Sequence, residues 1–329
     1  GLSMLDGSTT AHAQAESYFK IKIWGAPGVL MTMVMMGWLI GMQQASTVLK
    51  LTAITSLVNA GLDILLVFGL DMRVEGVAYA ALISAYLSAG LGVYFCLSIL
   101  KTHHVTLTIN LPDIGRLRRF MSLNLNILVR TLCLISAFAL FTRAGAQQGD
   151  TVLAANAVLL SFQMLLALSL DGFANALEVL VGEAIGAKDR RGFLRNVKIG
   201  MAWSVMAAVL FACAYLVFGH GLISLLTDIP AVAGVANDYL PWMVLSPLVA
   251  VWCFVFDGVF IGATEGGAMR NSMMFALFAV FIPALFLLGE HGNHGLWGAF
   301  MLFFAARGAS MAGLFYWIER HRGFVSAPR

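Results

Sequence analysis

The chain has 329 residues, of which 60% are hydrophobic and only 11% are charged, and its mean hydropathy is +0.86. Soluble domains carry about 25% charged residues, so this composition excludes a soluble globular protein and indicates an integral membrane protein. The formal net charge is only +3, and the basic residues are spread over several loops, so nothing suggests a nucleic-acid partner.

The hydrophobic runs predict an all-α membrane protein. They are about 20 to 30 residues long, whereas strands of a membrane barrel would be segments of roughly 10 residues that alternate in polarity. The opening GLSMLDGSTTAHAQAES has neither an initiator Met nor the features of a signal peptide, so it predicts a loop in a chain that begins mid-protein. Nine transmembrane helices follow, over residues 18–42, 48–70, 75–100, 117–142, 151–184, 193–222, 235–263, 268–289 and 295–318.

The basic residues predict the orientation of these spans. If the leading loop is outside, fourteen of the 20 Lys and Arg fall on the cytoplasmic side, where positive charge is enriched. They are Lys50, Lys101, Arg116, Arg118, Arg119, Lys188, Arg190, Arg191, Arg195, Lys198, Arg270, Arg320, Arg322 and Arg329. Only Lys20, Lys22, Arg73 and Arg143 lie on the opposite side.

A segment near the start of the chain recurs 221 residues later. GWLIG at 37–41 returns as GVFIG at 258–262. Repeats of this kind are typical of transporters whose binding site lies between two halves. If the last three spans repeat the first three, the repeating unit has six helices and the first unit lacks its first three. We therefore predict an incomplete first lobe at 1–100, a cytoplasmic linker at 101–116, a second lobe at 117–319 and a cytoplasmic tail at 320–329.

The span at 48–70 contains the sharpest polar feature. Asn59 and Asp63 are four residues apart and share one helix face in an otherwise apolar segment. A carboxylate at this depth is costly, and such residues are functional candidates by default. Asp63 is expected to bind H⁺ or Na⁺ with Asn59 as a second ligand, or else to lock neighbouring helices together.

Further charges lie deep in the second lobe and form candidate cavity residues. Asp171 is expected to pair with Arg130, and Asp257 is expected to pair with Arg307. Each pair is either part of a gated polar site or a buried structural ion pair. The full set of cavity candidates is Asn126, Arg130, Asp171, Asn175, Glu178 and Arg307.

Several features argue against an enzyme or a metal site. The four cysteines lie in apolar spans without paired spacing, so they predict neither a disulfide nor a metal site. Glu290, His291 and His294 have ligand-like spacing but fall in a short Gly-rich external loop, so no metal is expected. No nucleophile, base and orienting residue converge in a recognisable pattern.

Seven sequence motifs occur in the order seen in one transporter family. They are YFKIKIWGAPGVL, GWLIGMQQ, NAGLDILLVFGL, GVAYAALIS, NLNILVRTLCL, DGFANALEVLVGEAIGAKDRRGF and FDGVFIGATEGGAMRNSMM. They resemble the multidrug and toxic compound extrusion (MATE) transporters, and within them the DNA-damage-inducible F (DinF) branch.

The resemblance implies a two-lobe fold of twelve helices around a central cavity, of which this chain would carry nine. It implies a multi-pass protein of the bacterial inner membrane that exports organic, often cationic, compounds in exchange for H⁺ or Na⁺, with no other cofactor. Asn59, Asp63 and Asp257 would be the cation-coupling residues, and Ala81 stands where many relatives have a Thr partner.

The partners implied are small drug or toxin molecules, the lipid bilayer and, as a separate chain, the three absent helices. Two alternatives remain open. One is a flippase for lipid-linked oligosaccharides from the same superfamily, and the other is an inactive truncated or split chain.

Overall fold

A computed structural model describes residues 17–102 and 113–325 of the chain. Most of the predicted linker, the leading loop and the last four residues therefore lie outside the described residues. Within this part, nine helices are long and apolar enough to cross a membrane, which confirms the predicted spans to within a few residues. The chain divides into two compact units, unit 1 (Gly1–Leu111) and unit 2 (Pro112–Arg329).

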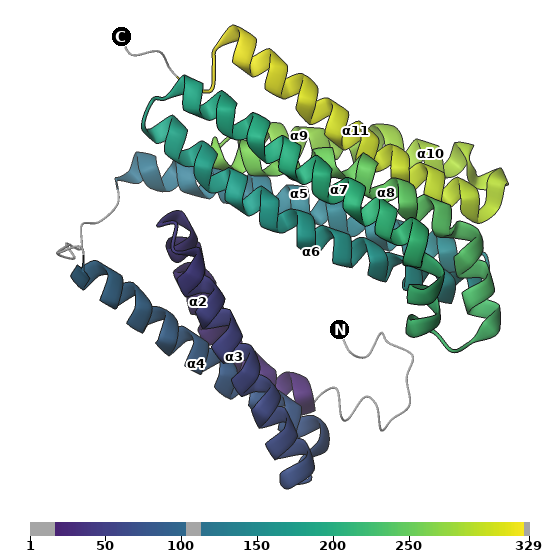
Figure 1. The fold of residues 1–329 in the computed structure, drawn as a ribbon, viewed down its shortest axis with the longest axis horizontal. Helices are drawn as coiled ribbons and strands as arrows, with labels where there is room; N and C mark the ends of the chain where they lie inside the picture. The colour runs from purple at the N-terminus through teal and green to yellow at the C-terminus, as the bar shows by residue number, and fades with distance from the viewer. Residues whose placement is uncertain (1–16, 103–112, 326–329) are drawn as a thin grey trace. The chain divides into compact units, whose positions relative to one another are not determined.

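Unit 1 is built on three helices, coloured purple to blue in Figure 1: α2 (Ala26–Gly41), α3 (Ala45–Ile64) and α4 (Arg73–Thr102). Helix α4 packs against both α2 and α3. Its contact with α2 is close, because a Cβ placed on Gly28 would lie 3.0 Å from the backbone carbonyl carbon of Ala85. Leu39, Leu51 and Cys96 form the buried centre of the unit.

Helix α3 changes its winding shortly after Asp63. The segment η3 (Leu65–Gly69) is π-helical, and the chain then turns at Asp71, whose φ of 53° lies in the left-handed region. Single π-helical turns inside helices are rare and are frequent at functional sites. The polar pair on α3 is thus followed directly by a widened helical turn.

Unit 2 contains the remaining long helices, coloured teal to yellow in Figure 1: α5 (Ile114–Ala146), α6 (Asp150–Gly186), α7 (Arg190–Leu226), α8 (Pro230–Gly262) and α11 (Gly292–His321). Helix α8 packs against α6, α7 and α11. About two thirds of its most apolar stretch is buried, more than in any other described span. A helix that is apolar on all sides belongs in such a central position.

The eighth span is continuous, but its helical winding changes part of the way along. It runs through α9 (Gly266–Met274), the π-helical segment η4 (Phe275–Phe281) and α10 (Ile282–Leu287), and the short turn η5 (Gly289–His291) leads into α11. Pro283 lies just after η4. A proline removes one helical hydrogen bond and clashes with the carbonyl four residues before it, so the wider winding accommodates the ring.

Glycines bring α6 and α8 into backbone contact. A Cβ on Gly258 would overlap the carbonyl oxygen of Ala174, and one on Gly262 would overlap that of Glu178. Small residues at membrane helix interfaces allow this close approach. We call this contact the glycine seam.

Polar contacts tie together one end of unit 2. Asp189 caps α7 by accepting a hydrogen bond from the Gly192 amide at 2.9 Å. Arg190 pairs with Glu319 at 2.7 Å. Arg322 pairs with Glu265 at 2.6 Å. The start of α7, the end of α11 and the turn between α8 and α9 therefore share one end, where most basic residues of unit 2 lie.

Candidate functional site

The polar pair of α3 contains a buried atom that lacks a partner. Asn59 and Asp63 are both half-buried in unit 1. Oδ1 of Asp63 is buried and, among the described residues, has no hydrogen-bond partner. A buried acceptor left unsatisfied costs about 1–3 kcal/mol, so a proton or a cation bound here would relieve that cost.

A second unpartnered oxygen lies on α4. Ser84 is 8% exposed, and its Oγ is also buried without a hydrogen-bond partner in the described part of the chain. Gly76 lies against Leu66, and Gly92 lies near Leu51. This antiparallel register places Ser84 at the level of Asn59, one helical turn from Asp63.

Ser84 is the residue that the sequence reasoning missed. The sequence pointed to Ala81 as the residue in the place of a Thr partner, whereas the structure buries a hydroxyl three residues further on. Composition and spacing do not reveal that its Oγ is fully buried without a partner, which is what marks it among the serines of α4.

Unit 2 holds a cluster of three charged side chains, which we call the charge triad. Arg130 on α5 and Arg307 on α11 both donate to Oδ2 of Asp257 on α8. The side chains are 17%, 4% and 8% exposed, respectively. The expected ion pair between Asp257 and Arg307 is confirmed, and it joins three helices rather than two.

The expected partner of Arg130 was wrong. Arg130 pairs with Asp257, whereas Asp171 interacts electrostatically with all three members of the triad without an ion pair among the described contacts. The reason is geometric: equal depth in the membrane does not decide which helix faces which. Asp171 and Asn175 are instead exposed on α6, and Glu178 is half-buried.

Asn126 does not join Arg130, although the two are four residues apart on α5. Its Oδ1 accepts a hydrogen bond from Arg270 at 2.9 Å, near the end of the unit where the basic residues gather. Asn126 is therefore part of an end contact between α5 and α9. The predicted cavity residues thus fall into three groups: the triad, the exposed stripe of α6 and the end contact.

Buried amides form another cluster that the sequence did not reveal. Asn156 and Asn293 exchange hydrogen bonds of 2.8 and 2.9 Å, and Nε1 of Trp297 donates to Oδ1 of Asn156 at 2.9 Å. The cluster joins α6 to α11 with its polar atoms satisfied. We regard it as structural because its amide groups bond to one another and to Trp297 rather than lining a pocket.

His294, one of the residues with ligand-like spacing in the sequence, makes packing contacts with aromatic side chains. Trp242 donates to Nδ1 of His294 at 3.1 Å, and the Tyr239 ring lies edge-on to it with centroids 4.7 Å apart. In residues 17–102 and 113–325, no group of three or more His, Cys, Asp or Glu side chains is placed to hold a metal ion.

Comparisons with known proteins all indicate one family. The family model MatE matches residues 127–287. DNA damage-inducible protein F of Escherichia coli is 38% identical over 95% of this chain and 68% of its own length. Protein DETOXIFICATION 42 of Arabidopsis thaliana is 27% identical over 90% of this chain, which spans only 56% of that relative.

The fold has a clear counterpart among solved structures. The crystal structure of a mutant of the Vibrio cholerae MATE transporter VcmN superposes with a TM-score of 0.87 at 19% identity. The match covers 98% of this chain and 74% of that one. At this identity the likeness shows the fold alone.

Proposed function

This chain belongs to the MatE family and is a multi-pass protein of the bacterial inner membrane, and on that premise we propose that it is a secondary antiporter. It exports organic, often cationic, compounds in exchange for H⁺ or Na⁺ by alternating access between two lobes. The relatives are transporters rather than enzymes, which agrees with the absence of a catalytic pattern in the sequence.

The observation that carries the proposal is the pair of unpartnered oxygens in unit 1. Oδ1 of Asp63 and Oγ of Ser84 are both buried on neighbouring helices, and Asn59 adds an amide on the same face as Asp63. A hard cation prefers such oxygen ligands, and a proton on Asp63 supplies a missing donor. We assign the coupling ion to Asn59, Asp63 and Ser84.

We do not assign a coupling ion to Asp257, although the family resemblance suggested it. Its Oδ2 already accepts from two guanidinium groups, which neutralise the carboxylate. Its other oxygen, Oδ1, is buried without a hydrogen-bond partner among the described residues, but the two positive charges paired with the same carboxylate repel a further cation. The charge triad is better explained as a link between α5, α8 and α11.

A ligand changes a conformational equilibrium only by its difference in affinity between the two states. Binding of the ion at Asp63 alters the contact between α3 and α4, next to the π-helical segment η3. We propose that this local change favours one of the two access states.

Efflux measurements on the full-length gene product test the assignment. Cells or proteoliposomes are given an imposed H⁺ or Na⁺ gradient, and loss of a fluorescent organic cation is followed. Asp63→Asn is expected to lower ion-driven efflux by about 5- to 150-fold, the range of a coupling free energy of 1–3 kcal/mol. Ser84→Ala should give a smaller loss.

Two matched variants serve as controls. Ser88→Ala removes a buried hydroxyl one turn further along α4, and Asp71→Asn removes an exposed carboxylate beside the same helix end. Both should keep ion-driven efflux within about twofold of the unmodified protein, as changes outside the site do. Unchanged efflux in Asp63→Asn would refute the proposed role.

Unit 1 also presents a surface suited to further membrane helices. In unit 2 the glycines of the repeat, Gly258 and Gly262, lie at the close contact between α8 and α6. Their counterparts Gly37 and Gly41 on α2 have no described atom within 4 Å of an added Cβ. We propose that this face receives a helix from a longer form of the protein or from a second polypeptide.

A further inference from the structure

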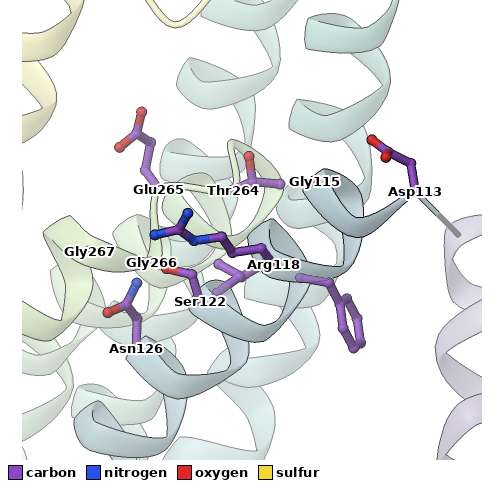
Figure 2. A pocket seen from close by; sticks show the side chains of 11 residues that line it. Asp113, Gly115, Arg118, Ser122, Asn126, Thr264, Glu265, Gly266 and Gly267 are labelled. Carbon is purple, nitrogen blue, oxygen red and sulfur yellow. The ribbon is translucent and has the colours of Figure 1, made fainter.

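A pocket with a volume of about 890 Å³ opens at the basic end of unit 2 (Figure 2). The start of α5 and the turn from α8 into α9 form its walls. The volume is in the range of about 300–1,000 Å³ typical of ligand sites. Neither the proposed coupling ion nor the charge triad uses this pocket.

The pocket lies at a membrane boundary. Two of the nine described spans begin within it, at Phe120 and Gly266. Phe120 and Leu123 contribute apolar wall, whereas residues before the spans contribute polar groups. A molecule held here would have one part at headgroup depth and another beside acyl chains.

Opposite charges line the pocket at separate places. Figure 2 shows the guanidinium of Arg118 extended towards the start of α9, whereas Asp113 lies apart from it at the start of α5. Glu265, the other acid of the pocket, is already paired with Arg322 at 2.6 Å. Among its described lining residues, the pocket thus offers one positive group, Arg118, and one unpaired negative group, Asp113.

The surroundings of Arg118 suit a phosphate. Gly266 and Gly267 begin α9; Leu123 packs against Gly266, whereas Gly267 has no described atom within 4 Å of an added Cβ, so its face of the helix start is open. The first N–H groups of a helix lack intrahelical partners and favour anions. Ser122 and Asn126 add a hydroxyl and an amide to the same wall.

We propose that this pocket binds the zwitterionic headgroup of a phosphoethanolamine lipid. Arg118 and the α9 amides hold the phosphate, Asp113 accepts hydrogen bonds from the ammonium group, and Phe120 and Leu123 contact the start of the acyl chains. A phosphoglycerol headgroup has no ammonium for Asp113. A phosphocholine headgroup has a quaternary nitrogen that cannot donate a hydrogen bond.

Lipid retention by the purified full-length protein tests this site. Native mass spectrometry counts bound lipids after titration with phosphatidylethanolamine, phosphatidylglycerol or phosphatidylcholine of identical acyl chains. Arg118→Gln should lower retention of all three lipids about tenfold, since each loses a charge-assisted hydrogen bond. Asp113→Asn should lower retention of phosphatidylethanolamine only, to the level of phosphatidylcholine.

Matched variants separate the pocket from general effects of charge. Arg195→Gln removes an exposed arginine at the same end of unit 2, and Asp150→Asn removes an exposed acid at the other end. Both should leave retention unchanged. Gly267→Leu places a side chain over the start of α9, from a position with no described atom within 4 Å of a Cβ, so it should block binding of the phosphate without disturbing packing.

Three results would overturn the proposal. One is equal retention of the three lipids by the unmodified protein. Another is full retention in Gly267→Leu. The third is displacement of phosphatidylethanolamine by millimolar soluble phosphoethanolamine, because a soluble metabolite would then be the better occupant.

Discussion

One carboxylate oxygen organises the charged centre of unit 2. Oδ2 of Asp257 accepts from both Arg130 and Arg307, so three helices meet at a single atom. Ions buried this deeply pay a large desolvation cost, which only mutual attraction offsets. Removal of the shared negative charge therefore deprives both guanidinium groups of their ion-pair partner at once.

We expect Asp257→Asn to lower the free energy of unfolding by about 3–5 kcal/mol, as the loss of one partner from a buried pair does. Chemical denaturation in detergent micelles measures this. Arg190→Gln, which breaks the pair with Glu319 by changing its exposed member, should cost about 1 kcal/mol or less. Adding Arg307→Met to Asp257→Asn should restore part of the lost free energy of unfolding. If the effects of the two substitutions on that free energy simply add, the interpretation of Asp257 as a shared acceptor is contradicted.

At this scale the sequence predicts which residues matter better than it predicts their partners. Asp63 and Asp257 stand out because a charge in an apolar run is unusual. The pairing of Arg130 depends on the rotation of α5 about its axis, which packing against neighbouring helices sets. Ser84 could not be found, because a serine in an apolar helix normally bonds to its own backbone.

At the scale of helices, the glycine seam fixes the distance between α6 and α8. Gly258 and Gly262 lie against the carbonyls of Ala174 and Glu178, so the two helix backbones touch. No side chain larger than hydrogen fits there without movement of a helix.

Gly258→Ala should lower the free energy of unfolding by about 1–3 kcal/mol, because the methyl group overpacks the seam. Gly234→Ala, on the same helix but with open space around it, should instead raise stability by about 0.5–1 kcal/mol through helix propensity. Denaturation of the two variants side by side checks this. Equal effects at the two positions would show that α6 and α8 are not in backbone contact.

The nine spans were predictable because each is a long apolar run with polar ends. The π-helical segments η3 and η4 were not, since a widened turn leaves hydropathy unchanged. Pro283 gave a partial signal for η4, but nothing comparable precedes η3. The tight α6 to α8 contact was visible only as the repeated pair of glycines.

At the scale of the whole molecule, the distribution of charge predicts the orientation in the membrane. The contacts of Arg190, Arg270 and Arg322 lie at one end of unit 2. Arg143, in the last turn of α5, is the only described Lys or Arg of unit 2 near the other end. Positive residues favour the cytoplasmic side.

Cysteine labelling tests this orientation. In a Cys213→Ala background, which removes the exposed native thiol, a membrane-impermeant maleimide should label Gln147→Cys in intact cells. Arg191→Cys, at the opposite end of unit 2, should be labelled only after permeabilisation. The reverse pattern would invert the proposed topology and place the lipid pocket in the outer leaflet.

The charge triad has an electrical consequence when Asp171 is counted with it. Two guanidinium groups and two carboxylates interact within this part of unit 2, so their formal charges sum to zero. Moving one net charge through the bilayer changes its energy by about 2.3 kcal/mol per 100 mV. When a lobe carries a neutral cluster across part of the bilayer, the membrane potential does no net work on that cluster. The voltage dependence of the cycle is then set by the transported ion and the substrate.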